Sequence, residues 1–239
     1  MHPLDNPIWN ALTTSQAHFA ETYRALRRFP PDVTPLGGFP EANGDGFDSL
    51  RGLLASGGAL GLFLPARVDA PPGLEIMLGG ALLQMILETG SRLPTSAHEH
   101  EFIELGGPDV PEMVTLATLT KPGPFDTRTR EMGTYLGIRK EGKLVAMAGE
   151  RLKLPGYTEI SAVCTHPDHL GHGYAGFLMT ILAGRIRSRR EVPILHVRPE
   201  NTRAVQLYER LGFRSRLLSH YAVFRAAKPE RLQAVSKQI

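Results

Sequence analysis

The stretch VCTHPDHLGHGYAGFLM, residues 163–179, constrains the fold of this 239-residue chain more than any other. A β-rich run comes first, Gly171 and Gly173 follow, and a helical apolar pattern begins directly after them. Glycine allows the positive φ angles that a tight turn needs. A turn at a helix start can also direct several backbone N–H groups at one anion. The stretch therefore predicts a strand that passes through a tight loop into a helix, and it leaves both interpretations of the glycines open.

The region around this stretch alternates between strand and helix patterns. Downstream, apolar residues recur at three- and four-residue spacing, as on one face of a helix. They are Tyr174, Phe177, Leu178, Ile181, Leu182 and Ile186. A second helix is expected from Asn201, a candidate N-cap, to Gly212, a candidate C′ glycine. With the strand-like runs included, the predicted order is strand, helix, loop, three strands, helix, strand, helix, strand. This order predicts an α/β (α+β) fold with a mixed central sheet and flanking helices.

The chain is predicted to have two parts and a tail. A polar stretch near residues 89–100 interrupts two structured regions. The predicted division is an N-terminal α/β region over residues 1–90, a second domain over 95–228, and a C-terminal tail over 229–239.

The N-terminal region has weaker patterns than the second domain. Apolar spacing predicts a helix over residues 15–29 and a strand over 59–66, whereas two glycines interrupt 74–88 and leave its structure open. Three roles remain open for this region: a degenerate second copy of the neighbouring fold, a lid, or a surface that forms a homodimer.

Composition limits the cellular compartment and the classes of partner that we expect for this protein. The formal net charge is only +3, and no long Lys/Arg block is present, so the sequence predicts no nucleic-acid partner and favours a small phosphorylated ligand. The single cysteine fits a reducing compartment. The N-terminus lacks the pattern of a signal peptide, and no apolar run approaches the ~18 residues of a membrane span. We expect a cytoplasmic protein without a membrane partner.

Two segments together carry a resemblance to a known family. SAVCTHPDHLGHGYAGFLM followed by PILHVRPENTRAVQLYERLGF resembles the GNAT N-acetyltransferase superfamily, and looks closest to its glycine N-acyltransferase-like branch. The first segment is similar to the family's Q/R-x-x-G-x-G/A pyrophosphate loop, with Leu170 where Gln or Arg is usual. The second is similar to its N-x-x-A-x-x-L-Y-x-x-x-G-F helix. The resemblance covers roughly residues 100 to 226.

The resemblance implies a fold in which two neighbouring strands part and hold acetyl-CoA between them. The cofactor-binding residues that it implies are Val163, Cys164 and Thr165 for the pantetheine arm, Gly171, His172, Gly173, Tyr174, Ala175 and Gly176 for the pyrophosphate, and Asn201. Asn201 can serve at the same time as a helix N-cap. Apart from this backbone role, Cys164 is expected to be an inert strand cysteine, because the sequence supplies no partner base.

Two residues are candidates for the chemistry of amine acetylation. Tyr208 matches the family's tyrosine, which protonates the leaving thiolate; the alternative is an aromatic residue on the core face of its helix. Glu159 is the candidate base, directly or through water, and the alternative is a solvated glutamate at a strand end.

Two further patterns have a functional and a plain interpretation. The run HEHE, residues 98–101, suggests a metal site but is more simply solvated charge, and we predict no metal. Arg128 lies in a Pro-rich loop where the resembled family binds its acceptor, so it contacts either an acidic group of the acceptor or a surface ion-pair partner.

The sequence therefore predicts an N-acetyltransferase that moves an acetyl group from acetyl-CoA to a primary amine of a small molecule or peptide by direct attack. One alternative is an N-acyltransferase that uses a longer acyl-CoA on an amino acid. Another is a non-catalytic sensor that binds acetyl-CoA.

Overall fold

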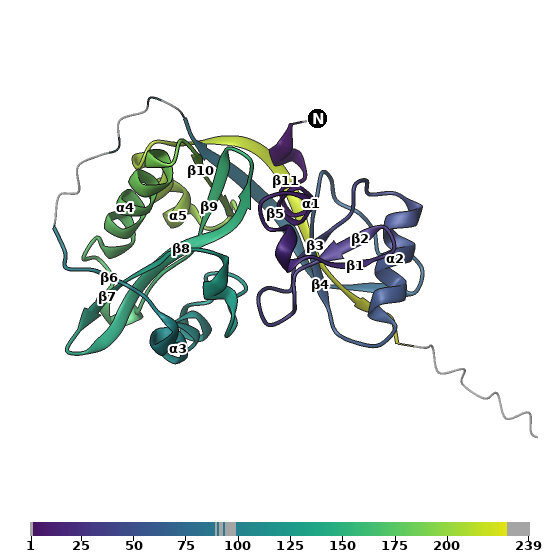
Figure 1. Ribbon diagram of the computed structural model, residues 1–239, viewed down its shortest axis with the longest axis horizontal. Helices are drawn as coiled ribbons and strands as arrows, with labels where there is room; N and C mark the ends of the chain where they lie inside the picture. Colours follow the sequence, from purple (N-terminus) through teal and green to yellow (C-terminus); the bar gives the residue numbers. More distant parts are fainter. Residues whose placement is uncertain (1, 89, 91–92, 94–98, 229–239) are drawn as a thin grey trace, which may run out of the picture.

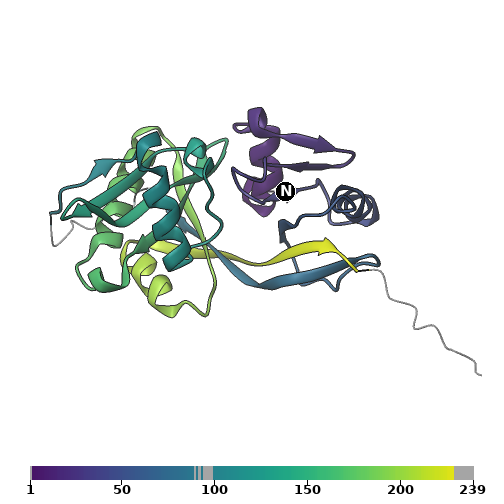
Figure 2. The same ribbon diagram turned by 90° about the horizontal axis from the view of Figure 1, so that it is seen from below.

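The computed structural model describes residues 2–88, 90, 93 and 99–228, and shows two lobes joined by a two-stranded ribbon (Figures 1 and 2). An eight-stranded mixed sheet runs through the larger lobe and the ribbon in the order β4-β11-β5-β10-β9-β8-β7-β6. A separate three-stranded sheet, β1-β2-β3, lies in the smaller lobe. The predicted C-terminal tail and His98 lie outside the described residues.

The larger lobe has the predicted order of elements. Its strands are β6 Ile103–Glu104, β7 Tyr135–Lys140, β8 Lys143–Leu154, β9 Tyr157–Thr165, β10 Val192–Val197 and β11 Phe213–Ala226. Its helices are α3 Val110–Thr120, α4 Tyr174–Ser188 and α5 Thr202–Arg210, with short 3-10 turns η3 Gly107–Asp109, η4 Thr129–Met132 and η5 Pro167–His169. The alternation of strands and helices expected from the sequence, and the mixed sheet with flanking helices, are both confirmed.

The two helices after the glycines form for the expected reasons. The apolar face of α4 lies in the core cluster that also holds Leu195 of β10 and Leu136 of β7. The Asn201 side chain caps α5 by accepting a hydrogen bond from the Ala204 N–H at 3.2 Å. At the other end of α5, Gly212 has a φ of 93°, the left-handed conformation typical of a C′ glycine.

The smaller lobe contains most of the N-terminal region. Its helical elements are η1 Pro3–Asp5, α1 Pro7–Thr13, η2 Ala17–Phe19 and α2 Gly44–Leu54. Its strands are β1 Glu21–Tyr23, β2 Leu26–Arg28, β3 Gly37–Gly38 and β4 Leu60–Leu64, the last of which is the predicted strand.

The helix predicted over residues 15–29 is wrong. The chain forms η2 and the hairpin β1–β2 instead, with a turn in which Arg24 has a φ of 53°. Leu26 packs in the core cluster beside α2, whereas Phe29 packs with Ile8 of α1 in another. A helix would turn residues three apart to one face, so burial in two separate clusters favours the extended chain.

The segment whose structure the sequence left open is the strand β5, Leu74–Leu87, and it crosses from one lobe to the other. It pairs antiparallel with β11 along its whole length and with β10 at its C-terminal end. Gly79 pairs with Ala222 of β11, and a Cβ there would stand 3.1 Å from the Tyr221 carbonyl oxygen. The sheet therefore continues across the domain boundary predicted near residue 90.

No helix of the described part of the chain is both long and apolar enough to span a membrane.

Candidate functional site

Two parallel strands of the large sheet part and form a fork. β9 and β10 pair only from Tyr157–Glu159 to Val192–Ile194. Beyond this point β10 pairs with β5, and β9 pairs with β8. The backbones of residues 160–165 and 195–197 face each other across the fork and therefore do not pair, as the resemblance implied. Exposed edges of this kind can accept the amide groups of an extended ligand.

A bulge in β9 lies just inside the fork. Ala162 and Val163 together face one residue of β8, because Ser161 pairs with Gly149 and Cys164 pairs with Met147. Ala162 has a φ of 52°, which is costly for a residue with a side chain. Bulges recur next to active sites because they redirect backbone groups. The sequence carried no signal for it, since the residue is an alanine in an apolar run.

The expected pantetheine-binding residues lie along the same edge. Cys164 and Thr165 pair on one side with Met147 and Ala146 of β8, so the other side of this stretch faces the fork. Burial raises the pKa of the Cys164 thiol to about 11. The thiol is thus protonated near neutral pH, and any contribution of Cys164 to the site comes from its backbone.

The glycine turn connects the end of β9 to α4. Gly171 and Gly173 have φ angles of 87° and 78°, and Gly173 is the N-cap of α4. The conformational interpretation of both glycines is confirmed. The first helical hydrogen bond runs from the Phe177 N–H to the Gly173 carbonyl oxygen at 3.0 Å. The first turn of a helix has N–H groups without intrahelical acceptors, so Tyr174, Ala175 and Gly176 present theirs beside the loop.

The side chains around this turn are aromatic and basic. The rings of His172 and Tyr174 stack with centroids 5.4 Å apart, and Lys140 Nζ lies 5.9 Å from the Tyr174 ring. His100 Nε2 donates a hydrogen bond to the His172 carbonyl oxygen at 3.0 Å. Leu170, which replaces the family's Gln or Arg, is 47% exposed. Positive charge near the turn can therefore come from Lys140 instead of position 170.

Tyr208 lies on α5, beside the start of α4. A Cβ at Gly176 would lie 3.3 Å from Leu207, which shows how closely the two helices approach. The Tyr208 ring makes an edge contact with Phe213 at 6.3 Å and is partly buried. Burial raises its pKa to about 12. With this pKa the hydroxyl keeps its proton near neutral pH. No hydrogen bond joins it to another described residue, so it can donate one to a ligand.

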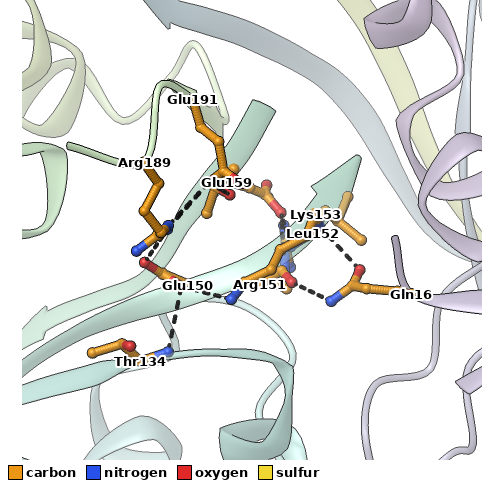
Figure 3. Close-up of polar contacts among 10 residues, drawn as sticks. Gln16, Thr134, Glu150, Arg151, Leu152, Lys153, Glu159, Arg189 and Glu191 are labelled. Atoms are coloured by element: carbon orange, nitrogen blue, oxygen red, sulfur yellow. Dashed lines mark hydrogen bonds and ion pairs between the residues drawn. The ribbon is translucent and has the colours of Figure 1, made fainter. Parts of the chain in front are cut away.

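Glu159 lies in an environment that neither interpretation of the sequence predicted. Its side chain is fully buried at the closed end of the fork, so the interpretation as a solvated strand-end residue is wrong. Arg151 binds both carboxylate oxygens, through Nε at 2.8 Å and Nη2 at 2.7 Å (Figure 3). His196 Nδ1 lies 2.7 Å from the same carboxylate.

These contacts argue against Glu159 as the base. The positive charge of Arg151 and the hydrogen bonds that it donates outweigh the effect of burial and hold the pKa of Glu159 far below its usual range. A carboxylate held in this way binds a proton poorly. Arg151 and His196 were not foreseen from the sequence, because they come from β8 and β10 and meet Glu159 only when the strands are side by side.

Arg128 and the possibility of a metal site were the other candidates from the sequence. Arg128 pairs with Glu131 at 2.8 Å and with Asp32 of the smaller lobe at 3.3 Å, so it has the ion-pair role. Within the described ranges, no group of three or more His, Cys, Asp or Glu side chains could hold a metal ion.

A buried hydroxyl lies close to the bulge. Tyr135 of β7 is completely buried, and its ring covers Gly149, where a Cβ would stand 2.2 Å away. Gly149 pairs with Ser161, so the ring extends toward the bulged part of β9. The Tyr135 hydroxyl has no hydrogen-bond partner among the described residues.

Comparison with known proteins agrees with this geometry. Residues 135–223 match the family described as FR47-like protein. A solved structure from Novosphingobium aromaticivorans, an acetyltransferase from the GNAT family, is 35% identical with a TM-score of 0.87, covering 95% of this chain and 100% of its own. A GCN5-related N-acetyltransferase from Kribbella flavida has a TM-score of 0.60 at 15% identity, over 92% of this chain and 96% of its own, and shows likeness of fold alone. No curated protein sequence matches the chain.

A mixed sheet whose parallel strands fork beside a glycine turn and a helix N-terminus is the arrangement expected of the GNAT fold. With the extent and identity of the Novosphingobium match, this chain belongs to the GNAT family of acetyltransferases.

Proposed function

We propose that this protein transfers an acetyl group from acetyl-CoA to a primary amine of a small molecule or peptide by direct attack. The observation that carries the proposal is the fork, whose open edge leads from the bulge at Ala162 to the glycine turn at the start of α4. One extended ligand with a phosphorylated end can contact all three features. The single buried cysteine agrees with a cytoplasmic setting.

The residues present fit acetyl-CoA. The N–H groups from Gly171 to Gly176 would hold the pyrophosphate, and the backbone of Val163 to Thr165 would pair with the pantetheine amides. Asn201, beside its capping role, has a side-chain N–H₂ group left to contact the cofactor. When bound, acetyl-CoA supplies an acyl thioester that is already activated toward an amine.

Tyr208 stabilises the departing sulfur as a hydrogen-bond donor. Its pKa of about 12 lies above the roughly 8.5 of an ordinary thiol, a gap worth about 5 kcal/mol against complete proton transfer. A donor that keeps its proton lowers the energy of a developing thiolate without that cost.

The proton of the acceptor amine leaves through solvent in this proposal, because Glu159 is held by Arg151 and His196. Attack requires the neutral amine, so the rate rises with pH until the amine has lost its proton.

The test is release of CoA thiol from acetyl-CoA with amino acids, polyamines, aminoglycosides and peptides as acceptors. We expect acceptor-dependent release, and Tyr208→Phe should reduce turnover by roughly 10²-fold with little change in acetyl-CoA affinity. Tyr157→Phe is the matched control, since Tyr157 lies at the closed end of the fork and contacts His2.

Other outcomes point to the alternatives. Release only from longer acyl-CoA with amino acids would replace acetyl transfer by acyl transfer. Tight acetyl-CoA binding without release for any amine would indicate a sensor.

A further inference from the structure

A buried glutamine of the N-terminal region reaches the closed end of the fork. Gln84 lies on β5, is 2% exposed, and its Nε2 stands 3.0 Å from His196 Nε2. The same Nε2 donates to the Leu4 carbonyl oxygen at 2.9 Å. Its Oε1 accepts a hydrogen bond from Arg216 Nη1 at 2.8 Å, while Arg216 Nη2 donates to Asp5 at 2.6 Å. All the polar atoms of the Gln84 side chain therefore have partners.

These partners determine where His196 carries its proton. A guanidinium only donates, so the Gln84 carbonyl must face Arg216 and its N–H₂ group must face His196. An amide N–H₂ group also only donates, so His196 Nε2 accepts and has no proton. Nδ1 lies 2.7 Å from the Glu159 carboxylate and must therefore be the protonated nitrogen.

We propose that Gln84 is a positioning residue that holds His196, a residue of the fork edge, as the neutral Nδ1–H tautomer. The consequence for turnover rests on the proposed function. The tautomer itself rests only on the hydrogen bonds.

A second buried glutamine supports the same role for this region. Gln16 lies just before η2, is 2% exposed, and donates to the Arg151 carbonyl oxygen at 2.8 Å (Figure 3). Its Oε1 accepts from the Lys153 N–H at 3.0 Å. Arg151 and Leu152 together face Glu159 in an irregular part of the β8–β9 ladder, so Gln16 satisfies backbone groups where the ladder does not. Both glutamines thus hold the neighbours of Glu159 from the side of the smaller lobe.

The charges around His196 are balanced without a proton on Nε2. Glu159 faces it from β9 with Arg151 of β8 behind, and Arg216 of β11 pairs with Asp5 of η1. From β4, the uncharged Phe63 ring lies 4.8 Å from the imidazole. A second proton would have to point at the Gln84 N–H₂ group, which has no acceptor to offer.

The direct test is ¹⁵N NMR of the full-length protein with labelled histidine. His196 is identified by its proximity to Phe63. We expect a neutral ring with the proton on Nδ1 at pH 7, and this result needs neither substrate nor turnover. A proton on Nε2, alone or in a charged ring, would overturn the proposal.

Two variants extend the test to the reaction. Gln84→Glu replaces the donor by an acceptor, so His196 should gain a second proton, seen by NMR. The ratio of amine-dependent rates at pH 8 and pH 6 should then change by roughly threefold or more. Arg216→Met should leave the tautomer unchanged, because the Leu4 carbonyl oxygen still requires the Gln84 N–H₂ group, and Arg214→Met, on the same strand but exposed, is its control. A neutral His196 in folded Gln84→Glu would refute the assignment, whereas an inactive wild type with the expected tautomer would refute only the proposed function.

Discussion

At the scale of single residues, the site contains two kinds of buried polar group: one with hydrogen bonds and ion pairs, and one without a partner in the described part of the chain. Glu159 receives hydrogen bonds from Arg151 and His196, while the buried hydroxyl of Tyr135 has no hydrogen-bond partner among the described residues. Burial of an unpaired hydroxyl costs roughly 1–3 kcal/mol, whereas a paired carboxylate stabilises the fold as long as it stays charged. The two residues should therefore respond to substitution in opposite directions.

Tyr135→Phe is expected to stabilise the free protein. The change removes the buried hydroxyl and leaves the packing over Gly149 intact, so the free energy of unfolding should rise by about 1 kcal/mol. For a chain of this size that corresponds to an increase in Tm of roughly 2–4 °C in thermal denaturation. Tyr157→Phe, whose hydroxyl contacts His2 at the surface, should change Tm little. A fall in Tm of Tyr135→Phe would mean that the hydroxyl has a partner in the folded protein.

Glu159→Gln should alter the pH dependence of stability. The pKa of Glu159 is lowered on folding, so its contribution is present above the unfolded pKa of about 4.3 and is lost as the pH falls toward the folded pKa. At pH 7 the variant should lose roughly 3–5 kcal/mol, because Arg151 keeps a buried charge without a partner. Between pH 5 and pH 3 the wild type should lose about 1–2 kcal/mol more than the variant.

Denaturant unfolding over this pH range measures the effect. Glu104→Gln is the control, since the Glu104–Arg185 pair is exposed and should contribute under about 1 kcal/mol. Parallel stability curves for the wild type and Glu159→Gln would show that Glu159 is not held as a charged group.

At the scale of elements, the start of α4 decides whether a phosphorylated ligand can bind. Gly173 is the N-cap in a left-handed conformation, and the N–H groups that follow it belong to the first helical turn. A side chain there both strains the backbone and obstructs close approach to those N–H groups. A variant with a side chain at another glycine of similar φ has the same backbone strain without obstructing these N–H groups, so it separates the two effects.

Gly173→Val should weaken acetyl-CoA binding by roughly tenfold or more, measured by titration calorimetry, because only a backbone without a side chain admits the pyrophosphate closely. Gly142→Val is the matched control: Gly142 has a similar φ of 77° in the turn between β7 and β8. It should lose stability without losing affinity. Unchanged affinity in folded Gly173→Val would exclude this turn as the phosphate site.

At the scale of the whole molecule, the N-terminal region is built into the acetyltransferase sheet. β5 lies between β10 and β11 and pairs with both. Without β5, two long strand edges of the larger lobe would have unpaired N–H and C=O groups. We therefore expect that the larger lobe does not fold without β5.

A fragment that contains only residues 99–228 should fail to fold, and its circular dichroism and NMR spectra should be those of a largely unfolded or aggregated chain. Addition of residues 1–88 as a separate chain should restore a dispersed spectrum, because β5 then completes the sheet. A well-dispersed spectrum from the isolated fragment would show that the second domain folds without β5.

The order of elements in the larger lobe, the helix after the glycines and the capped helix α5 could be predicted from the sequence, because each depends on residues within about one helical turn or one strand. The glycine turn was found from the same kind of local pattern, whereas Tyr208 was named from the resemblance to the GNAT helix motif and its role stays a prediction. The structure of residues 15–29 and the position of β5 depended instead on which distant cluster each apolar residue joins, as Leu26 and Phe29 illustrate.

The closed end of the fork was decided by tertiary structure alone. Glu159 meets His196, 37 residues away, and Gln84 meets His196 across 112 residues. The positive φ of Ala162 likewise follows from the ladder between β8 and β9 and not from the residue itself. Local sequence determines which segments form strands and helices, whereas burial and charge pairing between distant segments turn Glu159 from a candidate base into a fixed carboxylate.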